Sequence, residues 1–205
     1  MRILFSSANP VVLRRWRELL SSTPGEQAAT LAEAKRHLTV KKFDLVLLHR
    51  PLVDQQSFTD LQGIDPGTRF MLLSDRPYEE EGLSFLKAGI SGYANTYISP
   101  DLLKEAVRVI IGGGVWLGQQ IIQRLIQDMA AGEQRRPEAE AGQALPGLTK
   151  MERMVADMVA RGLANAQIAE DLKITERTVK AHLTSIYGKT KTGNRLGLAV
   201  LMNRG

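Results

Sequence analysis

The stretch FDLVLL at Phe43–Leu48 is a continuous apolar run, which predicts a β-strand buried on both faces. The stretch RFMLLS at Arg69–Ser74 has the same character and predicts a second strand of this kind. Strands without polar alternation are typical of parallel sheets that helices cover on both faces. These two stretches therefore favour an α/β fold with a central parallel sheet.

Segments on either side of these strands complete a repeating pattern of strands and helices. Strand-like segments lie at 2–6, 27–30 and 92–96, and helix-like segments lie at 10–20, from 32, at 79–87 and from 100. Gly89 is placed to end one helix, and Ser99 followed by Pro100 is placed to begin the next. Five strands that alternate with helices predict a doubly wound, five-stranded parallel sheet.

The chain is expected to divide into two domains. The last helix of the sheet region should bend or break at Gly112–Gly114 and resume as Val115–Met129, because three glycines weaken a helix. We expect an α/β domain at 1–131, a linker at 132–147 without apolar periodicity, and an all-helical domain at 148–205.

The formal net charge of +5 is concentrated in the last of these segments. Residues 1–131 hold 15 basic and 14 acidic side chains, residues 132–147 hold 2 and 3, and residues 148–205 hold 10 and 5. Clustered Lys and Arg side chains release counterions when they bind phosphate backbones. The charge distribution therefore predicts a polyanionic partner for the C-terminal segment.

Several classes of protein are disfavoured by composition. The chain has no cysteine, which excludes disulfides, Fe–S clusters, thiolate zinc sites and cysteine nucleophiles. Its three histidines, His37, His49 and His182, are far apart in the sequence, and no set of acid, base and nucleophile stands out. No apolar run is long enough to span a membrane. We expect a cytoplasmic protein that is not an enzyme, has no membrane partner and needs no metal or cofactor.

The C-terminal segment has the pattern of a helix-turn-helix. Thr149-Lys-Met-Glu152 has the form of a capping box and begins an apolar helical stripe. Gly162 ends this helix, a short second helix follows to Leu172, and a third begins near Thr175.

The third helix separates an inward face from a basic outward face. Val179, Leu183 and Ile186 have the spacing of core residues, which leaves Arg177, Lys180, Ala181 and Thr184 on the opposite side. Such side chains can contact guanine, a thymine methyl group or phosphate. Lys189, Lys191 and Arg195 follow, where they could contact phosphates without carrying sequence information.

Three motifs carry a resemblance to a known family: Leu148-Thr149-x-x-Glu152, Gly162-x-x-Asn165-x-x-Ile168-Ala169-x-x-Leu172 and Thr178-Val179-Lys180-x-His182-x-x-x-Ile186-x-x-Lys189. Together they resemble the LuxR-type four-helix DNA-binding domain of the LuxR and NarL/FixJ regulators. The sequence departs from the usual motif at Met151, where arginine is common, and at Ala164, where serine or threonine caps the second helix.

The resemblance implies a function for this segment. A recognition helix would enter the major groove of double-stranded DNA, with base contacts from Lys180, Ala181 and Thr184. Thr178 and His182 join the DNA-facing set through the motif, His182 as a structural or phosphate-contacting residue and not as a catalytic one. A homodimer would form through a fourth helix, Asn194–Met202.

With that tail, the α/β domain resembles a response-regulator receiver whose phosphorylation site is degenerate. The resemblance implies an acidic pair after the first strand, where this chain has Ser6-Ser7-Ala8-Asn9, and an acceptor aspartate where it has His49. The expected lysine is Thr96, and Ser74 alone matches the family pattern. Without carboxylates for magnesium and without an acceptor, ordinary aspartyl phosphorylation is not expected. A structural role for His49 is favoured over a phosphohistidine.

The α/β domain must then dimerise, bind a small ligand or meet a regulatory protein. Some receiver-like members of this group resemble cyclic di-GMP sensors with a Trp-x-Thr/Ser-Arg motif, and Trp116-Leu117-Gly118-Gln119 lies in the matching region. Trp116 could stack on a base, but Gln119 stands where the arginine would be, and a buried packing tryptophan is the simpler interpretation. The prediction is a dimeric, phosphorylation-independent transcription regulator, with ligand or partner control as the alternative.

Overall fold

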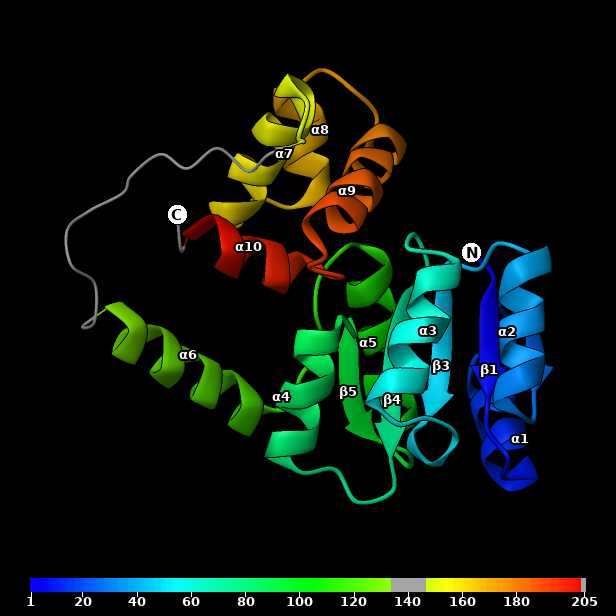
Figure 1. Cartoon of the computed structure of the whole chain (residues 1–205). Coiled ribbons are helices and arrows are strands. Elements are labelled where there is room, and N and C mark those ends of the chain that lie inside the picture. Colours follow the sequence, from blue (N-terminus) through cyan, green and yellow to red (C-terminus); the bar gives the residue numbers. More distant parts are fainter. Residues whose placement is uncertain (134–146, 204–205) are drawn as a thin grey trace.

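The computed structural model describes residues 1–133 and 147–203. Its first part is a five-stranded, all-parallel sheet with strand order β2-β1-β3-β4-β5 (Figure 1). The strands are β1 (Ile3–Ser6), β2 (Gly25–Ala28), β3 (Leu45–His49), β4 (Arg69–Ser74) and β5 (Gly92–Asn95). The predicted doubly wound α/β fold is confirmed.

Helices cover both faces of this sheet. They are α1 (Pro10–Leu19), α2 (Leu31–Val40), α3 (Gln55–Ile64), α4 (Glu79–Ala88), α5 (Pro100–Ile111) and α6 (Gln119–Glu133), with a short 3₁₀ turn η1 (Arg50–Leu52) after β3. Successive strand residues point to opposite faces, so that Ile3 and Phe5 pack with α1 and α5 while Leu4 packs with α2, α3 and α4. Apolar side chains are therefore buried on both faces, as the unbroken apolar strands predicted.

Local signals explain where several helices begin and end. Asn9 and Ser99 each accept a backbone hydrogen bond as the N-cap of a helix with proline in its first turn. Gly89 follows α4 in the left-handed region with φ of 108°, as predicted for a terminating glycine. Helix α3 was missed, although Asp54 and Ser57 form a capping box at its start.

The prediction that a helix resumes at Val115 is wrong. Helix α5 ends at Ile111, and Trp116 lies in an extended segment that pairs in parallel with Gly92 of β5. The Trp116 backbone N–H donates to Ser91 O (3.0 Å), and the Tyr93 N–H donates to Trp116 O (2.9 Å). This segment supplies partners to the backbone groups on the open edge of β5, which outweighs helix formation here. Helix α6 begins only at Gln119.

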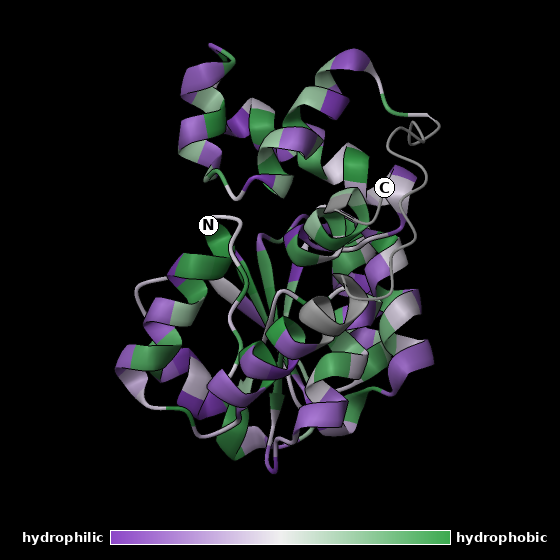
Figure 2. Cartoon of the chain, turned by 90° about the vertical axis from the view of Figure 1, so that its left-hand side faces the viewer, coloured by the Kyte–Doolittle hydropathy of each residue, from purple (hydrophilic) through white to green (hydrophobic). Residues whose placement is uncertain are grey.

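The second part of the structure is a helical domain. It consists of α7 (Lys150–Ala160), α8 (Asn165–Asp171), α9 (Glu176–Thr190) and α10 (Arg195–Asn203). Val179, Leu183 and Ile186 are buried in its core, as their spacing predicted, together with residues from α7, α8 and α10. Figure 2 shows hydrophobic residues on the inner strands of the α/β part and hydrophilic residues on the outer surfaces of the helices.

The helical domain is docked on the amino-terminal edge of the sheet, close to the end of α4 (Figure 1). The Asn194 side-chain amide donates to Leu86 O (3.0 Å) and to Ile90 O (2.9 Å). Gly89 and Gly193 approach so closely that a Cβ on Gly193 would lie 2.8 Å from the Cα of Gly89. The two parts therefore meet through direct backbone contact.

The structure does not test the expected domain limits directly, but their positions can be compared with the helices. Helix α6 extends two residues past the expected limit at 131, and most of the expected linker at 132–147 lies outside the described residues. In the two described ranges, no helix has both the length and the apolar character to cross a membrane.

Replacing Gly89 by alanine should destabilise the chain by about 1 to 2 kcal/mol, because a side chain is strained at this positive φ. A Cβ there would also lie 2.3 Å from Nε2 of Gln62. Urea unfolding followed by tryptophan fluorescence measures the change, since both tryptophans lie in the α/β part. Gly63→Ala is the control, because the helical Gly63 has open space around it. Equal stability of the two variants would contradict the prediction.

Candidate functional site

The helix-turn-helix is formed by α8 and α9. The turn between them uses Lys173 at φ of 53°, and Thr175 caps α9 by accepting a hydrogen bond from Thr178 N (3.1 Å). Helix α8 lacks a side-chain cap at Ala164, as the sequence indicated, and Gln167 instead reaches back to accept from Ala164 N (2.8 Å). These caps fix the direction in which α9 leaves the turn.

A buried carboxylate anchors α9 to α7. Glu152 is 4% exposed and accepts hydrogen bonds from Thr149 N (2.7 Å), Ser185 Oγ (2.6 Å) and Lys189 Nζ (2.6 Å). These donors, led by Lys189, lower the pKa of Glu152 to about 2. The predicted capping box is confirmed, whereas the part of Glu152 in joining α7 to α9 was not foreseen. Because Lys189 is engaged in this ion pair, its predicted contact with phosphate stays a prediction.

The predicted DNA-facing side chains share one side of α9. Arg177 and Ala181 are exposed, while Thr178, Lys180, His182 and Thr184 are partly buried. Lys191 is exposed just beyond α9, at φ of 56°. Arg195 instead turns inward, where its guanidinium donates to Leu163 O and to Asn165 Oδ1. The structure thus brings together most of the predicted set and separates Lys189 and Arg195 from it.

Part of this face is turned toward the α/β domain. The loop that precedes β4 lies against α9, and a Cβ on Gly67 would be 3.3 Å from Thr184 Cγ2. Lys180 and Thr184 share a cavity with Pro66, Gly67 and Arg69. In this docked arrangement, two predicted base-contacting residues therefore face protein.

At the opposite, carboxyl edge of the sheet, His49 occupies the position expected for a phosphoacceptor. His49 is 3% exposed, and its two ring nitrogens lie 2.8 Å from Ser7 Oγ and 3.1 Å from Asp75 Oδ1. Asn9 N donates to Ser7 Oγ (3.1 Å). Every hydrogen bond in this row of side chains has a donor and an acceptor when Ser7 Oγ–H donates to Nδ1 and Nε2–H donates to Asp75. This arrangement assigns the neutral ring to one tautomer. The hydrogen bond from His49 also lowers the pKa of Asp75.

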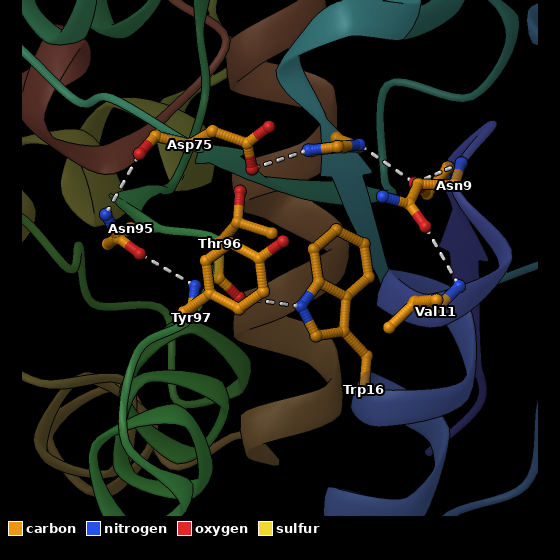
Figure 3. A network of polar contacts seen from close by, with 9 residues as sticks. Asn9, Val11, Trp16, Asp75, Asn95, Thr96 and Tyr97 are labelled. Atoms are coloured by element: carbon orange, nitrogen blue, oxygen red, sulfur yellow. Dashed lines mark hydrogen bonds and ion pairs between the residues drawn. The ribbon is translucent and has the colours of Figure 1, made fainter.

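Neighbouring side chains enclose this histidine, which is almost fully buried. Figure 3 shows how Trp16, Asp75 and Thr96 lie in the surrounding network. The indole of Trp16 packs edge-on against the His49 ring, with the two ring centres 5.9 Å apart. Its Nε1–H donates to Thr96 O (3.1 Å). Thr96 is fully buried, and Ser74 is 5% exposed. The described residues hold no group of three acidic or histidine side chains that could bind a metal ion. The pocket is thus filled by side chains, several of which hydrogen-bond to one another.

A second buried network links the end of β3 to α4 and β5. Glu81 accepts from Tyr93 Oη (2.7 Å) and from Arg50 Nε (2.6 Å). Arg50 also lies over the ring of Phe85, with its guanidinium carbon 5.1 Å from the ring centre. Burial raises the pKa of Tyr93. The sequence offered only one signal for this network, a polar Glu81 on the inward side of a helix.

The predicted ligand residues of the alternative function lie at the edge of the sheet. Trp116 is partly buried and packs against the apolar cluster beneath α1 and α5, while Gln119 is exposed at the start of α6. The packing interpretation of Trp116 accounts for its position. A stacking role for the same ring stays a prediction.

Comparisons with known proteins agree with this architecture. Residues 146–202 match the family GerE, described as bacterial regulatory proteins, luxR family. The chain is 26% identical to the nitrate/nitrite response regulator protein NarL of Escherichia coli K12, covering 98% of this chain and 94% of that protein. It is 28% identical to the DNA-binding transcriptional activator DevR/DosR of Mycobacterium tuberculosis, over 98% of this chain and 93% of that protein.

Two solved structures share the fold. A LuxR-family two-component response regulator from Aurantimonas sp. SI85-9A1 is similar over 63% of this chain and 97% of its own, with a TM-score of 0.55 and 21% identity. The response regulator RcsB, solved as a DNA complex, is similar over 99% of this chain and 98% of its own, with a TM-score of 0.53 and 15% identity.

Replacing Glu152 by glutamine should cost about 1 to 3 kcal/mol of stability near neutral pH, because buried charge-assisted hydrogen bonds are lost. The pKa of Glu152 lies below its ordinary value of 4.5, so its stabilisation is present above that value and is lost as the pH falls toward about 2. The difference in unfolding free energy between wild type and variant should therefore shrink as the pH falls from about 4.5 toward about 2. Urea unfolding followed by NMR signals of α7 and α9 measures it.

The exposed Glu170 on α8 provides the control for this experiment. Glu170→Gln removes the same charge without removing a buried hydrogen bond, and its stability should differ little from wild type at either end of the pH range. A pH-independent gap between wild type and Glu152→Gln would argue against the assigned pKa.

Proposed function

Because the segment at residues 146–202 is a luxR-family domain of bacterial regulatory proteins, we propose that this chain is a sequence-specific, DNA-binding transcription regulator. The observation that carries the proposal is the outward side of α9, where Arg177, Lys180, Ala181 and Thr184 follow one another at helical spacing. A helix with short and basic side chains on one side fits the major groove. Resemblance to NarL over almost the whole chain supports the same function.

Each part of this surface has a distinct task in the proposed mechanism. Lys180 donates to guanine, Ala181 contacts a thymine methyl group, and Thr184 hydrogen-bonds a base or phosphate. Arg177 and Lys191, both exposed, hold phosphates and set the register of the helix without reading sequence. Glu152 keeps α9 at a fixed angle to α7 and therefore positions the whole surface.

We infer that aspartyl phosphorylation does not control this activity. The acceptor position is His49, which is buried and engaged at both ring nitrogens by Ser7 and Asp75. No carboxylate lies in the loop after β1, so a divalent cation would have few of the oxygen ligands it requires there.

We infer a dimer on DNA, because proteins with a helix-turn-helix commonly bind two half-sites related by two-fold symmetry. The resemblance assigns dimerisation to α10. In the docked arrangement, Leu196 of α10 packs against the apolar core of the α/β domain. Contacts between α10 helices would then compete with docking for the same helix.

Control by a ligand or a protein partner is the second candidate, and the docked arrangement favours it. Lys180 and Thr184 cannot contact DNA while the loop at Pro66–Arg69 lies against them. DNA binding therefore requires the two domains to separate. A signal that shifts this equilibrium would regulate transcription without covalent modification.

Lys180→Ala is expected to weaken binding to the specific operator by about 1 to 3 kcal/mol while changing nonspecific binding less. Lys191→Ala should weaken binding to all sequences similarly and reduce the slope of affinity against salt. Fluorescence anisotropy with genome-selected and random DNA, over a salt series, measures both effects. Equal losses on both DNAs for Lys180→Ala would contradict base contact.

Treatment of the full chain with acetyl phosphate and Mg²⁺ should leave its mass and its DNA affinity unchanged, because the acceptor position carries no carboxylate. Intact-protein mass spectrometry and the same anisotropy assay check the two readouts. A covalent phosphate that alters DNA affinity would restore control by phosphorylation.

A further inference from the structure

The interface between the two domains encloses a small cavity whose lining is cationic. Arg69 of β4 approaches it from the α/β domain, and Lys180, Tyr187 and Arg195 approach it from the helical domain. Backbone of Gly67 also borders it. Among the lining residues, all of which are described, none is acidic.

Of the described carboxylates, none forms an ion pair with Arg69, Lys180 or Arg195, although the charge of Asp44 favours the charged form of Arg69. The Arg69 side chain makes no hydrogen bond or ion pair there, and burial lowers its pKa. Burial likewise lowers the pKa of Arg195, whose donors reach only a carbonyl and an amide oxygen. Burial raises the pKa of Tyr187 to about 12, so its hydroxyl stays protonated and can donate.

Nearby carboxylates are occupied elsewhere. Asp65 pairs with Lys42 (3.1 Å) and accepts from Thr68 and Gly67 in its own loop. Asp44 is exposed and pairs with the chain amino group and the backbone of Arg2. Neither carboxylate lines the cavity. Because the three partly buried cations repel one another and no acidic side chain lines the cavity, a negative charge at this place would stabilise the docked arrangement.

The free space in the cavity limits the size of the anion that can bind there. The cavity has a volume of about 20 Å³, which is small beside most ligand sites, and a single water molecule occupies roughly 10 to 15 Å³. A phosphate group or a carboxylate on a carbon chain is larger than this space. A monatomic anion fits, with guanidinium, ammonium and phenol groups as donors.

We propose that this cavity binds one small inorganic anion of the size of chloride and that the bound anion holds the two domains together. Arg69 supplies its cation from one domain, and Lys180 and Arg195 supply theirs from the other. An anion that binds only the docked arrangement stabilises it and thereby opposes DNA binding. This regulation rests on the proposed function, because Lys180 can serve the anion or the operator but not both.

Domain docking can be measured directly in the full chain. The natural sequence has no cysteine, so Gln56→Cys on α3 and Glu170→Cys on α8 introduce two dye sites at exposed positions. Energy transfer is recorded while potassium glutamate is replaced by potassium chloride at constant ionic strength, since glutamate is too large for the cavity. Transfer should rise with chloride, and DNA affinity should fall about threefold to tenfold.

Matched variants separate a specific site from a general salt effect. Arg69→Gln should abolish the chloride dependence of energy transfer, whereas Arg76→Gln removes the same charge at an exposed position on the opposite edge and should retain it. Tyr187→Phe removes one donor with little change in volume and should raise the chloride concentration needed for docking. This second variant keeps the test decisive if Arg69→Gln folds poorly.

The outcomes distinguish the two proposals. Energy transfer that ignores chloride, or that responds equally in wild type, Arg69→Gln and Tyr187→Phe, overturns the anion site. A chloride response with the expected pattern, in a chain that binds no DNA in either salt, supports the anion site and overturns the proposed function.

Discussion

Asn194 joins the two halves of this protein and fixes the orientation of its C-terminal helix. Its Oδ1 atom accepts from Gly197 N (2.7 Å) at the start of α10, while its Nδ2 donates to two carbonyls at the end of α4. Asn194 is 2% exposed, and both bonds to the carbonyls of Leu86 and Ile90 are buried. This amide contributes to the docking of the helical domain that covers Lys180 and Thr184, together with the close approach of Gly89 to Gly193 and the packing of Leu196.

The pocket at the carboxyl edge of the sheet is held together by hydrogen bonds around His49. Ser7, His49 and Asp75 form a continuous hydrogen-bonded chain in which every ring nitrogen has a partner. Trp16 closes the pocket from α1. Buried polar groups that satisfy one another are stable without a cation or a phosphate. The ends of β1, β3 and β4 therefore support a hydrogen-bonded chain that runs from the buried Ser7 through His49 to the exposed Asp75.

Much of the fold follows from local patterns. The apolar runs in β3 and β4, the glycine after α4 and the Thr149–Glu152 capping box each depend on neighbours within a few residues, and each appears in the structure as predicted. The segment around Trp116 differs, because its conformation depends on the unpaired edge of β5, far away in the sequence. Periodicity alone favoured a helix there. Competition from a distant backbone edge is invisible to a local pattern.

By itself, the sequence determined the α/β class, the helix-turn-helix and the residues on the outer side of α9, because periodicity, capping and local charge suffice for these. Only the tertiary structure decided which of those residues face solvent. Lys189 turns to Glu152, Arg195 turns into the domain interface, and Lys180 shares a cavity with Arg69. These partners are 30 to more than 100 residues apart along the chain. Their pairing arises from how the two domains dock, which depends on long-range burial and electrostatics.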